Sequence, residues 1–171
     1  MILRFACVLL VLSTSATAGV RSSAIPLGDF LFLTASADQL AIYRGLPRRS
    51  QDRKFYAEEN RTKPHFLTFD NGFYREPLAL PQTELDAIIA ALDTPGVLIP
   101  HRGAKLCGGF HADYLPAWRR EGKNVAVMLL CYGCHEAILA TADKKAKMDL
   151  SSDGAKRLRD ALPLAVKSGT E

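Results

Sequence analysis

Three of the four cysteines and two of the histidines are the residues of this chain whose types and spacing could do chemistry. Cys131, Cys134 and His135 form a C-x-x-C-H motif, and Cys107 and His111 form a second thiol–imidazole pair earlier in the chain. Thiolates and imidazoles bind zinc and similar metals, and C-x-x-C-H is also the attachment sequence of a c-type haem. The same cysteines could instead form a disulfide or exchange one with a partner. The motif predicts thiol chemistry and leaves its kind open.

The surroundings of the motif favour a metal or structural thiol site. The apolar run Val125–Leu130 precedes it and Ala137–Leu139 follows it, which is the composition of two strands and not of the helix that carries a haem. Gly133 permits a tight turn that lets both motif cysteines point the same way. A strand and a turn with two thiols are typical of tetrahedral metal sites. We therefore favour zinc or a similar metal, with covalent haem c and a redox-active C-x-x-C as the alternatives.

A hairpin predicted to turn at residues 121–124 would bring the two thiol–imidazole pairs together. In an ideal hairpin closed by this turn, Cys134 lies opposite His111, and Cys107 lies about four residues further along. Gly108 and Gly109 could fold the chain back over that distance. Three cysteines with one histidine are a recognised zinc ligand set. The candidate metal ligands are Cys107, His111, Cys131, Cys134 and His135; in the haem alternative the last three hold the haem.

The elements that must position this site indicate an α+β fold. We expect short buried strands, or the ends of elements, at Phe30–Leu33 and Leu40–Tyr43. A hairpin turning at Asp70–Gly72, a helix from Thr83 to Pro95, the hairpin on either side of 121–124, and a helix from about Ser152 are also expected. Residues 44–64 are polar and are expected to form a surface loop with one helical turn. Together these elements predict a small single domain, an antiparallel sheet of hairpins with one or two packed helices.

The first residues have the pattern of a secretory signal peptide. Arg4 precedes the apolar run Phe5–Leu12, and Ala16–Ala18 is a small-x-small cleavage site. We expect a signal peptide over residues 1–18, a single domain over 19–171, and export to the periplasm or beyond the cell. No other stretch has the length of a membrane span. Cys7 leaves with the signal peptide, and an odd number of remaining cysteines cannot all pair within one chain.

Charge and motif content narrow the classes of function. A formal net charge of +4 is too mild to predict a nucleic-acid partner. Four arginines could contact an anionic partner: Arg44, Arg48, Arg49 and Arg53. The chain has no Ser-His-Asp order, paired-carboxylate signature or glycine-rich phosphate loop, so neither a hydrolase nor a nucleotide enzyme is predicted. Enzymatic activity stays open, with redox activity as the candidate.

The chain resembles a group of uncharacterised exported bacterial proteins that has no known activity. The resemblance covers most of the mature chain and rests on four segments: Tyr43–Pro47, Phe73–Leu78, Lys105–Tyr114 and Leu130–Glu136. Arg48 departs from the pattern, which has a histidine after Gly-Leu-Pro, so no further ligand is expected from that loop. The resemblance implies that Cys107 belongs with Cys131 and Cys134.

Overall fold

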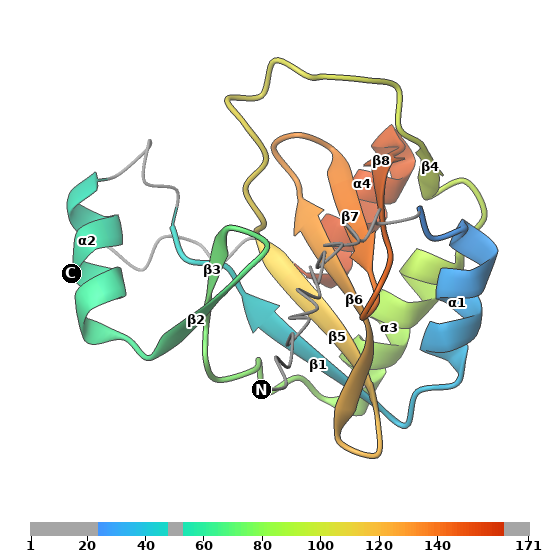
Figure 1. Ribbon diagram of the computed structural model, residues 1–171, viewed down its shortest axis with the longest axis horizontal. Coiled ribbons are helices and arrows are strands. Elements are labelled where there is room, and N and C mark those ends of the chain that lie inside the picture. Colours follow the sequence, from blue (N-terminus) through green and yellow to red (C-terminus); the bar gives the residue numbers. More distant parts are fainter. Residues whose placement is uncertain (1–23, 48–52, 163–171) are drawn as a thin grey trace, which may run out of the picture.

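A computed structural model describes residues 24–47 and 53–162, which form an α+β fold on a six-stranded antiparallel sheet. The strand order is β1-β5-β6-β7-β8-β4, and strands β2 and β3 form a separate hairpin (Figure 1). The strands are β1 (Gln39–Arg44), β2 (His65–Thr68), β3 (Asn71–Tyr74), β4 (Leu98–Pro100), β5 (Tyr114–Arg120), β6 (Lys123–Cys131), β7 (Glu136–Ala140) and β8 (Lys145–Leu150). The helices are α1 (Leu27–Ala35), α2 (Arg53–Thr62), α3 (Gln82–Asp93) and α4 (Ser152–Ala161). The predicted fold class is confirmed, whereas the predicted signal peptide lies outside the described residues.

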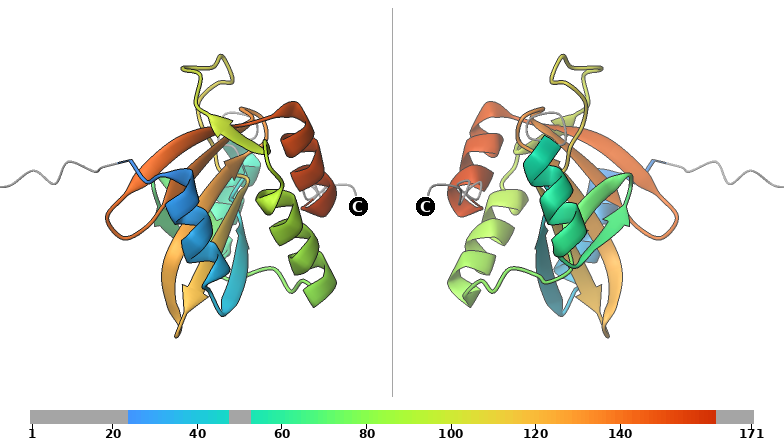
Figure 2. Two further views of the ribbon diagram at one scale, coloured as in Figure 1. Left: turned by 90° about the vertical axis from the view of Figure 1, so that its right-hand side faces the viewer. Right: turned by 90° about the vertical axis from the view of Figure 1, so that its left-hand side faces the viewer.

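The sheet is covered on both faces. Helices α1, α3 and α4 lie on one face, and α2 with the β2–β3 hairpin lies on the other side (Figure 2). On the helical face, Phe30 of α1 meets Trp118 of β5 edge-on at 5.7 Å between ring centroids, and Ile88 of α3 is fully buried. On the opposite face, Phe66 and Phe73 of the hairpin pack against each other with 5.7 Å between their ring centroids. Burial from both sides explains why the central strand β6 is apolar at nearly every position.

The hairpin of β5 and β6 is confirmed, but its register differs from the prediction. The turn is Glu121–Gly122, with φ angles of 51° and 74° that suit a two-residue hairpin loop. The pairing shifts between Trp118 and Arg119, which indicates a bulge that the ideal register ignored. The predicted pairing of Cys134 with His111 is wrong, because both residues lie beyond the ends of the paired strands.

Other predicted elements had mixed outcomes. The strand at Leu40–Tyr43 and the helices near Thr83 and Ser152 are confirmed as β1, α3 and α4. The first hairpin is also confirmed, although the residues with positive φ are Phe69 and Asp70, so its turn lies earlier than predicted.

Two local predictions were wrong. The segment predicted as a strand at Phe30–Leu33 is part of α1, which begins after Pro26 and has Leu27, Phe30 and Leu33 at helical spacing toward the core. The polar segment expected as a surface loop with one helical turn contains a longer helix, α2, which has 10 residues and no buried side chain. Strands β4 and β8 were not predicted.

Within the described part of the chain, every helix falls short of the length and apolar character that crossing a bilayer requires.

Candidate metal centre

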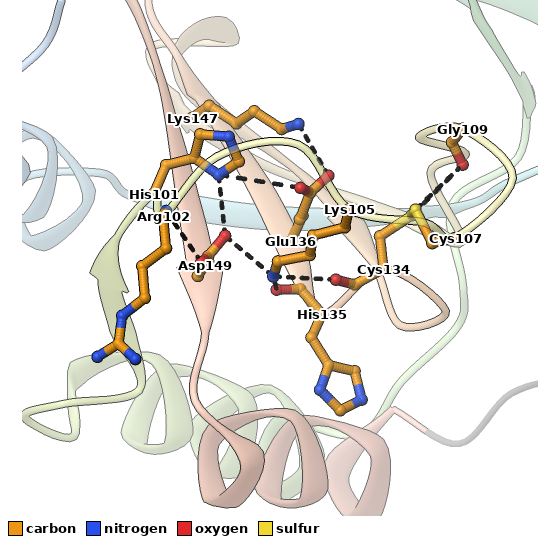
Figure 3. Close-up of polar contacts among 10 residues, drawn as sticks. All are labelled: His101, Arg102, Lys105, Cys107, Gly109, Cys134, His135, Glu136, Lys147 and Asp149. Atoms are coloured by element: carbon orange, nitrogen blue, oxygen red, sulfur yellow. Dashed lines mark hydrogen bonds and ion pairs between the residues drawn. A yellow bond between two sulfur atoms is a disulfide. The ribbon is translucent and has the colours of Figure 1, made fainter.

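Two of the predicted ligands form a disulfide. Cys107, in the loop after β4, is bonded to Cys134, in the turn between β6 and β7, with an S–S distance of 2.06 Å (Figure 3). The bond fastens a loop of residues 101–113, which has neither helix nor strand, to one end of the sheet. Cys107 is therefore linked to the C-x-x-C-H motif through Cys134, the second cysteine of the motif.

Cys131 is placed differently from the other two cysteines. It is the last residue of β6, is fully buried, and pairs with Glu136 in the β6–β7 ladder. It takes no part in the disulfide. Because disulfide sulfurs are not thiolates, the disulfide-bonded form does not present the predicted three-thiol set. A thiolate metal site, or haem attached through Cys134, would first need this disulfide to be reduced. Both remain predictions.

Neither of the two predicted histidine ligands belongs to a group of three metal-ligating side chains within the described residues. Nδ1 of His111 lies 3.8 Å from Oδ1 of Asp113 and has no hydrogen-bond partner among the described residues. His135 has a φ angle of 50° in the turn between β6 and β7. Its imidazole points away from the carboxylates of Glu136 and Asp149 (Figure 3). Burial, together with the nearby charges of Arg159 and Lys105, lowers the pKa of His135. The neutral form of the imidazole is therefore favoured.

A different group of side chains converges next to the disulfide. His101 follows β4, Glu136 opens β7, and Asp149 lies near the end of β8. Glu136 and Asp149 are direct partners in the β7–β8 ladder, so their side chains share one face of the sheet. Nδ1 of His101 lies 2.9 Å from Oδ1 of Asp149 and 3.8 Å from Oε1 of Glu136 (Figure 3). All three potential ligand atoms lie within 4.8 Å of one another.

Two lysines neutralise the two carboxylates. Nζ of Lys147 lies 3.0 Å from Oε2 of Glu136, and Nζ of Lys105 lies 3.0 Å from Oδ1 of Asp149. Lys105 also donates to two backbone carbonyls of the β6–β7 turn at 3.1 and 3.0 Å. The two ammonium charges balance the two carboxylate charges. This pairing explains how Glu136 and Asp149 tolerate exposures of only 1% and 3%.

The hydrogen bonding of the two carboxylates is unequal. Burial alone raises the pKa of Asp149, but hydrogen bonds from His101, Lys105 and the amide of Arg102 outweigh it and lower the pKa to about 2. In contrast, Oε1 of Glu136 is buried and has no hydrogen-bond partner among the described residues, although it faces His101. A buried acceptor without a donor is costly. A cation between this oxygen and the imidazole would remove that cost.

The donor set of one imidazole and two carboxylates suits a divalent metal ion. Bonds of about 2.0–2.2 Å to a tetrahedral zinc ion place its ligands about 3.4 Å apart. The distances from Nδ1 of His101, 2.9 and 3.8 Å, lie on either side of that value. Within the described part of the chain, this is the one group of three such side chains that could hold a metal ion. The side chain of His101 is 25% exposed, which leaves the group open to solvent on one side.

None of these three residues was among the predicted ligands, although the sequence contains signals for two of them. Glu136 directly follows the C-x-x-C-H motif. The alternation of Ala146, Met148 and Leu150 with charged residues is the pattern of a strand whose other face carries Asp149. No local pattern indicates His101.

The predicted anionic contact involves residues far from this group in the sequence. The guanidinium of Arg44 lies 4.6 Å from the ring centroid of Tyr74, and Arg53 opens α2. Arg48 and Arg49 lie outside the described residues. The contact remains a prediction.

The fold and this group of side chains define a small α+β protein with a candidate metal centre beside a disulfide. No family model, curated protein or solved structure matches the chain. The site is therefore the basis on which a function is inferred.

Proposed function

We propose that the protein is exported and binds one divalent transition-metal ion, zinc or a similar metal, through His101, Glu136 and Asp149. The buried acceptor Oε1 of Glu136, which faces His101 without a hydrogen-bond partner among the described residues, carries the proposal. A bound ion would give this oxygen a partner and would replace the proton between His101 and Asp149. Three protein ligands would leave a fourth position for water or an external ligand, as in zinc sites that are not purely structural.

The ligand types narrow the choice of metal. Imidazole nitrogen suits zinc, copper, iron and nickel, whereas carboxylate oxygen also suits manganese and magnesium. A site with imidazole and carboxylate ligands and no thiolate favours zinc, because zinc binds both ligand types and prefers four ligands. The disulfide supports export, because such bonds persist in oxidising compartments.

Metal binding is tested on the purified disulfide-bonded protein after its metal has been removed with a chelator. Calorimetric titration with Zn²⁺ should give one ion per chain, and Co²⁺ should give the visible absorption of a four-coordinate nitrogen–oxygen site. His101→Ala and Glu136→Gln each remove a ligand and should weaken binding at least about 100-fold, beyond the effect of losing an outer partner. His65→Ala is the matched control: Nδ1 of His65 lies 3.0 Å from a backbone carbonyl, and this variant should bind like the wild type.

The oxidation state of the protein separates this proposal from the predicted thiolate site. An ion bound while the disulfide is intact supports the His101 group. An ion that binds only after reduction, and is lost in Cys131→Ser, supports the three-cysteine site and contradicts the proposal. A protein that binds no ion in either state also contradicts it.

A second function, thiol–disulfide exchange, is favoured by the position of Cys131 three residues before the disulfide-bonded Cys134. The thiolate of Cys131 would attack Sγ of Cys134, form a new bond to it and break the bond to Cys107. The electron pair leaves on Cys107, which takes up the proton that Cys131 released, so no external oxidant is needed. Alkylation followed by peptide mapping should find a Cys131–Cys134 bond in part of the protein. If only Cys107–Cys134 is found after partial reduction, this function is wrong.

A further inference from the structure

The ammonium group of Lys105 occupies an oxygen-lined position beside the candidate metal site. Its Nζ lies 3.0 Å from Oδ1 of Asp149, and it donates to the backbone carbonyls of Cys134 at 3.1 Å and His135 at 3.0 Å. These three acceptors use all three of its hydrogens. Lys105 therefore already fills a cation position within the protein.

The same carboxylate oxygen would serve both the ammonium and a metal ion. Oδ1 of Asp149 accepts hydrogen bonds from His101 at 2.9 Å and from Lys105 at 3.0 Å. An ion that replaces the proton on His101 would share this oxygen with Lys105 and would be repelled by its charge. Lys147 differs, since it binds Oε2 of Glu136 and not the oxygen that faces His101.

The disulfide holds Lys105 more than it holds His101. Lys105 lies in the loop of residues 101–113, and Cys107, two residues later, is bonded to Cys134, whose own carbonyl accepts from Lys105. His101 opens the same loop, but it directly follows Pro100, which pairs with Met148 in the β4–β8 ladder. Opening the disulfide should therefore free Lys105 while His101 keeps its place.

We infer that Lys105 competes with the metal ion for Asp149, and that the Cys107–Cys134 disulfide keeps this competitor in place. Reduction of the disulfide thus raises the affinity of the His101 group for metal; a dithiol reductant supplies the two electrons and two protons that convert the disulfide into two thiols. The inference rests on the proposed function. Loss of one charge-assisted hydrogen bond to the shared oxygen corresponds to an increase in affinity of about 10- to 100-fold.

The test compares Zn²⁺ affinities, measured against a chelating dye, in variants that avoid new thiol ligands. Lys105→Met in the disulfide-bonded protein should bind about 10- to 100-fold more tightly than the wild type. The Cys107→Ala/Cys134→Ala variant should gain affinity by a similar factor, and adding Lys105→Met to it should give little more. Lys156→Met is the matched control, because that lysine lies on α4 in an exposed pair with Asp160, and it should have no effect.

Each outcome has a distinct meaning. A loss of affinity or no change in Lys105→Met overturns the competition, whereas a gain in Lys105→Met with none in the double alanine variant overturns the role of the disulfide. If no protein in the series binds Zn²⁺, the proposed function itself fails. Hydrogen exchange without metal gives an independent reading: reduction should speed exchange in the loop around Lys105 and leave β4 unchanged. Equal acceleration of both segments would overturn the inference, even if the double variant fails to fold.

Discussion

Replacing Asp149 with Asn should lower the free energy of unfolding by about 3 kcal/mol, because one buried carboxylate serves three donors. Oδ1 accepts from His101 at 2.9 Å and from Lys105 at 3.0 Å, and Oδ2 accepts from the amide of Arg102 at 3.2 Å. An asparagine keeps only one of these oxygens and turns an NH₂ group toward the remaining donors. Breaking a buried ion pair from one side costs about 3–5 kcal/mol. The side chain of Lys105 is 29% exposed and can reach water, so the lower end applies.

Urea unfolding followed by the fluorescence of Trp118, the single tryptophan, measures this loss. A double-mutant cycle with Lys105→Met should give a coupling of about 1–3 kcal/mol between the two side chains. Asp160→Asn breaks an exposed pair with Lys156 and, as the control, should stay within about 0.5 kcal/mol of the wild type. A loss below about 1 kcal/mol, or additive effects in the cycle, would refute the role given to Asp149.

The stability of the protein at acid pH should depend on the same carboxylate, that of Asp149. The pKa of Asp149 falls from 3.8 to about 2 on folding, so its contribution to stability is complete above the higher value and is lost as the pH falls toward the lower one. A pKa that falls from 3.8 to about 2 corresponds to at most about 2.5 kcal/mol of stability, less whatever solvent screens on the open side of the site. The difference between the wild type and Asp149→Asn should therefore narrow below about pH 4. Parallel loss of stability in both proteins would contradict this assignment.

The disulfide, one close backbone contact and one open helical position give further tests. Replacing both Cys107 and Cys134 with Ser should cost about 3–4 kcal/mol in urea unfolding, from the loop entropy of a separation of 27 residues, and an unchanged midpoint would argue against the bond. A Cβ on Gly45 would lie 2.1 Å from the carbonyl oxygen of Ala112, so Gly45→Ala should cost about 2–3 kcal/mol or more. Gly28→Ala, with open space around it in α1, should instead stabilise by about 0.5–1 kcal/mol. Melting temperatures in the reverse order would contradict both assignments.

Local patterns were sufficient for the elements that local physics determines. The apolar run of β6, the spacing of Ile88 and Leu92 in α3, and the start of α4 near Ser152 could be predicted without knowledge of the fold. The apolar segment around Phe30 was misread because four successive apolar residues fit a buried strand and a helix equally well. Pro26 directly precedes the first residue of α1, where its missing N–H costs the helix no hydrogen bond, and it was the signal that separates the two.

The candidate site depends on pairings that no short window contains. Glu136 and Asp149 meet because β7 and β8 pair, and His101 joins them because β4 pairs with the far side of β8. The resemblance associated Cys107 with Cys131 and Cys134, and the structure joins Cys107 to Cys134 in a disulfide. The three residues of the His101 group were not predicted, because spacing within a motif says nothing about which distant strand lies alongside it.

The position of β4 at the outer edge of the sheet has a consequence for how the protein keeps its edges closed. This strand has only three residues and ends in Pro100, so few backbone hydrogen bonds hold it to β8. Short strands and proline at an edge discourage pairing with other chains, and the hydrogen bond between His101 and Asp149 adds to those that hold this strand to β8. An ion shared by His101 and the carboxylates of β7 and β8 would tie this strand across two neighbours at once. A bound ion would then help to keep this edge closed against pairing with other chains.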